Sequence, residues 1–200
     1  MDQRQQIRQT LRARRAAQPL EQCAQDSLQI CETLIHSPLL QRAKRIACYF
    51  AHGKEVDLTG LMLAAWQRNK QTFLPVLAQF PKGQLWWVPY TKDTPLYQNR
   101  FGIHEPQHPK RLRRTKLRSL DVILMPLVAF DANGHRIGMG GGFYDRSLAR
   151  LRANHSWHRP LRIGVAFSWQ QVPAIPAQAW DIPLDAVVTE QAMTFFRKQV

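Results

Sequence analysis

Apolar residues along this chain alternate between two patterns, one typical of amphipathic helices and one typical of buried strands. The helical pattern predicts one or two helices within residues 1–36, and a further helix over residues 58–69. Short apolar runs predict strands at 45–50, 71–75 and 84–89, and the second should end at Pro75, which cannot donate a ladder hydrogen bond. In the second predicted helix, residues 21–35, we expect the buried positions to be Ala24, Leu28, Cys31 and Ile35.

The remaining pattern completes an alternation of strands with helices. Residues 96–101 are expected to form a loop or short helix, while 161–167 and 186–189 predict the last two strands. Strands that alternate with helices are typical of a mainly parallel sheet with helices on both faces. The sequence therefore predicts one domain over residues 1–200, with a three-layer, Rossmann-like α/β fold.

The stretch from 121 to 146 breaks this regular pattern and carries the candidate chemistry. An apolar run at 121–130 predicts a strand buried on both faces, and Asp131 to Gly134 supplies a turn. Four glycines follow within five residues, at 138, 140, 141 and 142, and then Tyr144, Leu148 and Leu151 lie at helical spacing. A glycine loop between a strand and a helix can aim backbone N–H groups at a phosphate. A surface hairpin without function is the alternative.

Two better-known phosphate motifs do not fit this loop. No GxxxxGK[ST] occurs, and the dinucleotide fingerprint would need a glycine at position 143, which is Phe143.

Composition and charge narrow the class of protein. The 200 residues, 44% hydrophobic and 21% charged, suit one soluble globular domain. No apolar run is long enough to cross a bilayer and no secretory signal is evident, so we expect a cytoplasmic protein. The three cysteines form no CxxC pair and are expected to be free thiols. The net charge of +14 is compatible with nucleic acid, an anionic small substrate or a well-solvated surface.

Basic residues gather in two places. Arg4, Arg8 and Arg12 share one face of the first predicted helix, where they would repel one another unless an anion lies against them; a solvated face is the alternative. Six more lie between 110 and 118, which favours a solvated loop over an RNA contact because no aromatic residues are interleaved.

Two other kinds of site find little support. The spacings of His104 with His108 and of His155 with His158 would suit zinc, but no further ligand completes either set. No Gly-x-Ser-x-Gly elbow indicates a serine hydrolase.

The glycine stretch resembles the signature of the 5-formyltetrahydrofolate cyclo-ligase family, also called methenyltetrahydrofolate synthetases. That signature reads FDxxGxRxGxGxGYYD and follows a strand. The chain departs from it at Phe143, where the family usually has Tyr. It departs also at Leu127, because in the family the strand before the signature usually ends in MPG-like residues with Gly at this position. The resemblance extends from about Arg4 to Thr189. The matching positions are Phe130, Asp131, Gly134, Arg136, Gly138, Gly140, Gly142, Tyr144 and Asp145.

The resemblance implies a set of site residues. Arg136 would be catalytic, and Asp145 and Asp181 would hold Mg²⁺. Residues expected at ATP are Arg4, Arg8, Arg136, Ile137, Gly138, Met139, Gly140, Gly141, Gly142, Phe143 and Tyr144. Residues expected at the folate are Phe50, Glu55, Phe101, Met139, Gly140, Gly141, Gly142 and Phe143.

The activity implied by the resemblance is closure of 5-formyltetrahydrofolate to 5,10-methenyltetrahydrofolate with ATP and Mg²⁺, releasing ADP and phosphate. Phosphorylation of the formyl oxygen would turn a poor electrophile into a good one, so the protein's task is positioning and charge stabilisation. We expect a monomer that binds neither membrane nor nucleic acid. Two other interpretations stay open: an RNA- or ribosome-associated module, and a nucleotide-binding regulator without turnover.

Overall fold

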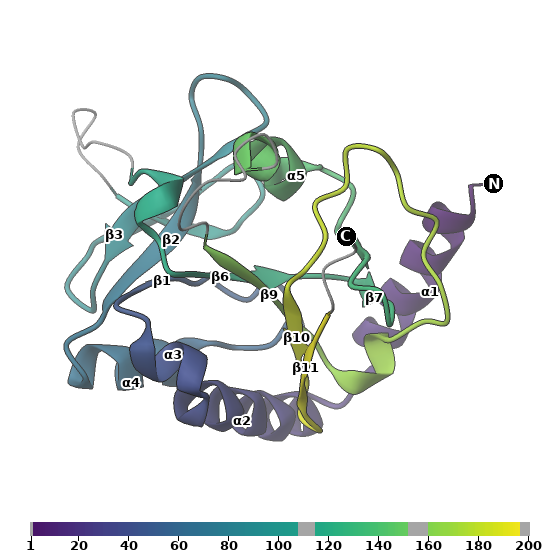
Figure 1. The fold of residues 1–200 in the computed structure, drawn as a ribbon, viewed down its shortest axis with the longest axis horizontal. Coiled ribbons are helices and arrows are strands. Elements are labelled where there is room, and N and C mark those ends of the chain that lie inside the picture. The colour runs from purple at the N-terminus through teal and green to yellow at the C-terminus, as the bar shows by residue number, and fades with distance from the viewer. Residues whose placement is uncertain (1, 108–114, 152–159, 197–200) are drawn as a thin grey trace.

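The computed structural model describes residues 2–107, 115–151 and 160–196, and its centre is a seven-stranded sheet (Figure 1). The strand order is β11-β10-β9-β6-β1-β2-β3. The five inner strands are parallel, and antiparallel β3 and β11 form the two edges. The strands of this sheet are β1 Arg45–Ala47, β2 Gln71–Leu77, β3 Leu85–Tyr90, β6 Val122–Pro126, β9 Leu161–Val165, β10 Ala186–Val188 and β11 Met193–Phe195.

Helices cover both faces of the sheet, as the alternation of strands and helices predicts. Three helices, α2, α3 and α4, lie along one face, and the short α5 lies on the other (Figure 1). The first helix, α1, stands beside the sheet near the short strand β7, Ala129–Phe130 (Figure 1). The helices are α1 Gln3–Ala17, α2 Leu20–His36, α3 Pro38–Arg42, α4 Thr59–Gln67 and α5 Phe143–Leu148, with 3-10 turns at Leu117–Ser119, Ala149–Leu151 and Ser168–Gln170.

The alternation of side chains along the central strands gives the sheet an apolar core on each face. Ile46 and Leu124 point into the cluster shared with α2 and α4. Their neighbours Ala47 and Ile123 point into the cluster that contains Leu148 of α5. Because parallel strands are buried on both sides, near-continuous apolar runs are what this architecture requires. The mainly parallel α/β fold predicted from the sequence is confirmed.

The buried face of α2 differs from the predicted one. Ala24 and Leu28, expected in the core, are both exposed, Leu28 by 63%, whereas Ser27 on the adjacent face is buried. The Ser27 hydroxyl donates to the Cys23 carbonyl at 2.6 Å and accepts the Asp57 N–H at 3.2 Å. A buried hydroxyl with both partners costs little, so hydropathy alone misplaced this face of the helix.

The prediction that the second strand ends at Pro75 is wrong. Strand β2 continues to Leu77, and Pro75 lies opposite Trp87 of β3. The register with β1 stops at Ala47 and Phe73, so β1 has no residue opposite Pro75. The missing N–H of Pro75 therefore leaves no hydrogen bond to β1 unmade.

Two further segments depart from the predicted elements. The run 121–130 divides into β6 and a short strand β7, Ala129–Phe130, which pairs with β8, Arg136–Ile137. The segment expected as a loop or short helix contains β4, Leu96–Gln98, in a hairpin with β5, His104–Pro106. This second hairpin is polar and mostly exposed, so apolar periodicity could not reveal it.

Two findings concern membrane and thiol chemistry. Within the described ranges no helix has the length and apolar character needed to span a bilayer. Cys23, Cys31 and Cys48 are free, as predicted, and buried. Burial raises the pKa of the Cys31 thiol to about 11, which makes it a poor nucleophile at neutral pH.

Candidate active site

A cavity of about 510 Å³ opens beyond the carboxyl ends of the central parallel strands. Strands β1 and β6 are neighbours, and the chain proceeds from them to opposite edges of the sheet. Such a reversal of strand order leaves a crevice in which open α/β sheets bind ligands. The lining comes from the segment after β1, from β2, from the β4–β5 hairpin, from the end of β6 and from the glycine loop. The topology therefore brings segments that are distant in the sequence to one cavity.

The glycine loop, residues 138–142, forms one side of this cavity between β8 and α5. Gly140 has a φ of +105° and Gly142 a φ of +61°, which side chains of L-residues rarely allow. The loop is largely exposed. Its backbone can therefore be approached closely by a ligand, as the sequence predicts for a phosphate loop.

Arg136 and Asp145 form an ion pair at the base of the glycine loop, and both line the cavity. Arg136 Nη2 donates to Asp145 Oδ1 at 2.8 Å, and Arg136 Nη1 donates to the Ile182 carbonyl. The same Asp145 oxygen accepts the Ile182 N–H at 3.1 Å. Arg136 is only 6% exposed, so its guanidinium is held in one place and presents a fixed positive charge to the cavity.

Three arginines of α1 contact the glycine loop or line the cavity. Arg8 Nε donates to the Gly138 carbonyl at 3.0 Å, and Arg12 lines the cavity. Arg15 Nη1 donates to Glu55 at 3.3 Å, and its Nη2 contacts the Met139 sulfur at 3.3 Å. The predicted basic face of this helix thus meets the loop that would hold an anion.

Arg4 differs from the other arginines of this face because it is ion-paired with Asp181. Its two terminal nitrogens lie 2.5 and 3.2 Å from the Asp181 carboxylate, and one also donates to the Pro176 carbonyl. Asp181 further accepts the Gln178 N–H at 3.0 Å. Both side chains are about nine-tenths buried, so this pair ties α1 to the 176–181 segment rather than facing the cavity.

The two predicted metal ligands therefore have different surroundings. Asp145 lines the cavity beside the glycine loop, where a carboxylate and phosphate oxygens could share Mg²⁺. Asp181 is held by Arg4. Across the described ranges, no three His, Cys, Asp or Glu side chains come together as an ion-binding group. Asp145 fits a magnesium role in which phosphate supplies further oxygens, and Asp181 as placed does not; both assignments stay predictions.

Glu55 is a buried carboxylate in the cavity wall, as expected for a residue that would meet the substrate. It accepts hydrogen bonds from Arg15 and, at 3.1 Å, from the His52 N–H. Burial raises the pKa of its carboxyl, while the Arg15 charge opposes that rise. Arg15 therefore helps keep Glu55 ionised.

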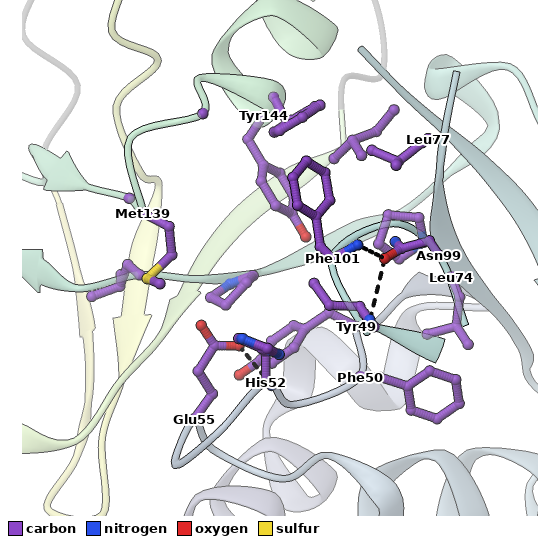
Figure 2. Close-up of a pocket in the computed structure, with 18 of the residues that line it drawn as sticks. Tyr49, Phe50, His52, Glu55, Leu74, Leu77, Asn99, Phe101, Met139 and Tyr144 are labelled. Carbon is purple, nitrogen blue, oxygen red and sulfur yellow. Dashed lines mark hydrogen bonds between the residues drawn. The ribbon is translucent and has the colours of Figure 1, made fainter. Parts of the chain in front are cut away.

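Aromatic rings supply much of the remaining wall (Figure 2). Phe50 packs edge-on against Tyr90 with ring centroids 5.3 Å apart. Phe101, at the tip of the β4–β5 hairpin, meets Phe143 at the start of α5 edge-on, with ring centroids 6.0 Å apart. Tyr144 completes this side, and burial raises the pKa of its phenol. Flat, mainly apolar walls with a few polar groups suit a flat heterocyclic ligand.

The structure adds site residues that sequence reasoning missed. Tyr49 lines the cavity, and so do Asn99 and Glu105 of the hairpin. Arg15 could have been found, because it continues the helical spacing of Arg8 and Arg12. Asn99 and Glu105 could not, because their hairpin was not predicted.

Some sequence predictions lie mainly outside the described residues. Lys116 and Arg118 of the basic run are exposed, but its first part falls in 108–114, and His155 and His158 fall in 152–159.

Comparisons with known proteins agree on one family. The model of the 5-formyltetrahydrofolate cyclo-ligase family matches residues 1–190. The chain is 40% identical over 181 residues to the Haemophilus influenzae 5-formyltetrahydrofolate cyclo-ligase, covering 90% of this chain and 94% of that protein. It is 38% identical to the Escherichia coli K12 protein of the same name, covering 90% and 96%.

Solved structures give the same result for the fold. An Aquifex aeolicus 5,10-methenyltetrahydrofolate synthetase superimposes with a TM-score of 0.80 at 30% identity, covering 98% of this chain and 94% of that one. A Mycoplasma pneumoniae synthetase superimposes with a TM-score of 0.73 at 19% identity, covering 94% and 99%.

Proposed function

This chain belongs to the 5-formyltetrahydrofolate cyclo-ligase family, and we propose that it closes 5-formyltetrahydrofolate to 5,10-methenyltetrahydrofolate with ATP and Mg²⁺. The observation that supports this proposal best is the cavity itself. A buried Arg136 and a left-handed glycine loop form one side of it, and aromatic rings form much of the rest of its wall. One side suits phosphate and the other a flat ring, and the reaction needs both together.

The chemistry begins with a formyl group that is a poor electrophile, because N5 donates electron density into its carbonyl. Transfer of the γ-phosphoryl group to the formyl oxygen breaks its bond to ADP and makes that oxygen a leaving group. N10 then attacks the formyl carbon, the carbon–oxygen bond breaks to release phosphate, and N10 loses its proton. The protein supplies orientation and charge and needs no nucleophile of its own.

The phosphate half of the reaction is assigned to the glycine-loop side. Backbone N–H groups of the loop would cradle the transferring group, and Arg136 would stabilise its developing charge. Arg8, which contacts the Gly138 carbonyl, would bind the nucleotide phosphates with the loop. Asp145 would hold Mg²⁺, which supplies positive charge to the phosphate oxygens when bound.

The folate half is assigned to the aromatic side and to Glu55. The faces of Phe50, Phe101 and Phe143 would pack against the flat rings. The Glu55 carboxylate, kept ionised by Arg15, would accept hydrogen bonds from N–H groups on the pterin edge.

A direct test mixes the protein with Mg-ATP and 5-formyltetrahydrofolate and follows methenyl product and ADP. Equal amounts of the two products support the proposal. A nonhydrolysable ATP analogue serves as the matched control and should give no product. ATP binding without turnover would instead favour a nucleotide-binding regulator, and salt-sensitive RNA binding without turnover would favour the nucleic-acid interpretation.

A further inference from the structure

The β4–β5 hairpin is attached to the main sheet through one buried carboxylate. Glu105 is only 3% exposed, and its Oε1 accepts the Leu77 N–H of β2 at 3.0 Å. Leu77 lies beyond the last residue of β2 that pairs with β1, so its N–H is free to donate to this side chain. The Glu105 carboxylate therefore accepts a hydrogen bond from β2 at a point beyond the end of the neighbouring strand β1.

The same carboxylate also organises the hairpin. Its Oε1 accepts from Asn99 Nδ2 at 2.7 Å, and its Oε2 accepts from the Tyr97 hydroxyl at 2.8 Å. With the Leu77 N–H, three donors converge on a carboxylate that is almost wholly enclosed.

Asn99 connects Glu105 to the tip of the hairpin through hydrogen bonds. Its Oδ1 accepts the Phe101 N–H at 2.8 Å and the Ile103 N–H at 3.2 Å, as Figure 2 shows. The amide is thus bound at both ends, to Glu105 on one side and to the turn on the other. Phe101 then meets Phe143 at the start of α5, and both rings line the cavity. A continuous series of contacts runs from the sheet to the aromatic ring.

We propose that Glu105 and Asn99 are positioning residues that set folate affinity by holding Phe101 in the cavity wall. This inference rests on the proposed function, because it takes Phe101 to contact the folate. Phe101 is 47% exposed, so packing alone does not hold its ring where it lies. The Asn99 amide fixes the backbone that carries the ring, and the buried carboxylate fixes the amide. The phosphate side is not part of this series.

Four variants separate positioning from a general effect on the fold. Asn99→Ala removes the link between Glu105 and the turn. Tyr97→Phe is the matched control, because it removes a donor from the same carboxylate and leaves Asn99 in place. Glu105→Gln is the conservative variant: its oxygen can accept from Leu77 and Asn99 while its amide donates to the Tyr97 oxygen. Glu105→Leu removes every acceptor.

Isothermal titration measures the Kd for 5-formyltetrahydrofolate and the Kd for Mg-ATP separately, and KM and kcat are measured beside them. We expect Asn99→Ala to weaken folate binding about tenfold, the effect of losing one well-placed buried hydrogen-bonding group. Its ATP affinity and melting temperature should stay near those of the wild type. Tyr97→Phe and Glu105→Gln should stay within about threefold for both ligands, whereas Glu105→Leu should weaken folate binding at least as much as Asn99→Ala.

The outcomes distinguish this inference from the proposed function. Wild-type folate affinity in a folded Asn99→Ala protein would overturn the positioning role, and so would an equal loss of folate and ATP affinity. Wild-type protein that binds folate without turnover would refute the proposed reaction, while the comparison of Asn99→Ala with Tyr97→Phe would still decide the inference. No folate binding by the wild type would overturn both.

Discussion

The two sides of the cavity are held in place by different kinds of interaction. On the glycine-loop side, charged groups fix the wall: Arg136 with Asp145, and Arg15 with Glu55. On the hairpin side, one carboxylate receives neutral donors from Leu77, Tyr97 and Asn99, and apolar side chains face the cavity. Figure 2 shows Met139 and Glu55 on one side and Leu74, Leu77 and Asn99 on the other.

This difference indicates how one cavity can accept two unlike molecules. Fixed charges stabilise a transferring phosphoryl group without rearrangement, because their positions are set before it arrives. Apolar walls bind a flat ring by burying its surface, and they depend on shape rather than on charge. Substitutions of the glycine loop and Asp145 should therefore change the dependence on ATP and Mg²⁺, and those of Arg15 or Glu55 should change how folate binding depends on pH. Substitutions on the hairpin side should change folate affinity alone.

The largest effect is expected at Asp145, on the charged side. Asp145→Asn keeps an oxygen that can accept from Arg136 and Ile182 but removes the negative charge. If the carboxylate holds Mg²⁺, turnover should fall roughly a hundredfold or more and recover in part at high Mg²⁺. Turnover is measured against Mg²⁺ concentration, and the melting temperature without ligand should stay near normal.

Asp181→Asn is the control for this substitution. Its loss leaves the buried Arg4 guanidinium with a neutral partner, so we expect a lower melting temperature and little change in the dependence on Mg²⁺. Full activity of Asp145→Asn at low Mg²⁺ would show that Asp145 only orients Arg136 and the Ile182 backbone.

A smaller effect is expected from the backbone of the glycine loop. Gly140→Ala forces a side chain onto a φ of +105°, which costs about 1–2 kcal/mol and should weaken ATP binding about tenfold. Gly138→Ala is the matched control, because its backbone is not left-handed and an added Cβ meets open space. Calorimetric titration with ATP compares the two. Equal losses would mean that the left-handed conformation does not matter for the nucleotide.

We expect folate affinity to change several-fold with pH because of the ion pair between Arg15 and Glu55. Burial raises the Glu55 pKa, so this carboxyl takes up a proton at a higher pH than usual, and folate affinity should fall as the pH drops through that raised value. Arg15→Gln removes the charge that opposes the rise, so the loss should begin at a still higher pH.

Met139→Leu is the control for Arg15→Gln, because it removes the sulfur contact but keeps the charge. It should leave the pH profile of folate binding unchanged. Identical pH profiles for wild type and Arg15→Gln would contradict the role given to this ion pair.

The smallest effect is expected at Tyr49, a residue of the cavity lining that belongs to neither set of contacts. Its hydroxyl is buried and finds no hydrogen-bond partner among the described residues. Tyr49→Phe removes an unpaired polar group, so the melting temperature should stay the same or rise by about 1–3 °C. Thermal unfolding without ligand measures this. A clear fall would show that the hydroxyl has a partner in solution.

Sequence reasoning anticipated the parts of the site that depend on regular periodicity or on an ordered motif. The parallel strands appeared as apolar runs, and the glycine stretch identified the loop together with Arg136 and Asp145. The basic face of α1 was evident because a helix brings every fourth residue to one side. These features are local, so a short window of sequence contains them.

The rest depended on contacts between distant segments. Nothing near Glu105 in the sequence indicates that the Leu77 N–H would need a partner, since that need arises only because β1 is shorter than β2. The ion pair of Arg4 with Asp181 joins residues 177 positions apart. It places Arg4, predicted to bind ATP, and Asp181, predicted to bind Mg²⁺, in contact with each other. A polar residue's role depends on its partner, and local patterns do not identify partners.

The position of α1 has a consequence for the order in which the active site is completed during synthesis. This helix is synthesised before the segments that it contacts, since Arg8 pairs with Gly138 and Arg4 with Asp181. Closing loops of that length is entropically costly and slow, so we expect α1 to dock after the sheet has formed. A nascent chain that stops before residue 176 therefore contains the glycine loop but lacks Asp181, the ion-pair partner of Arg4 in α1. Arg4 can therefore take up its contacts only after residues 176–181 have been made.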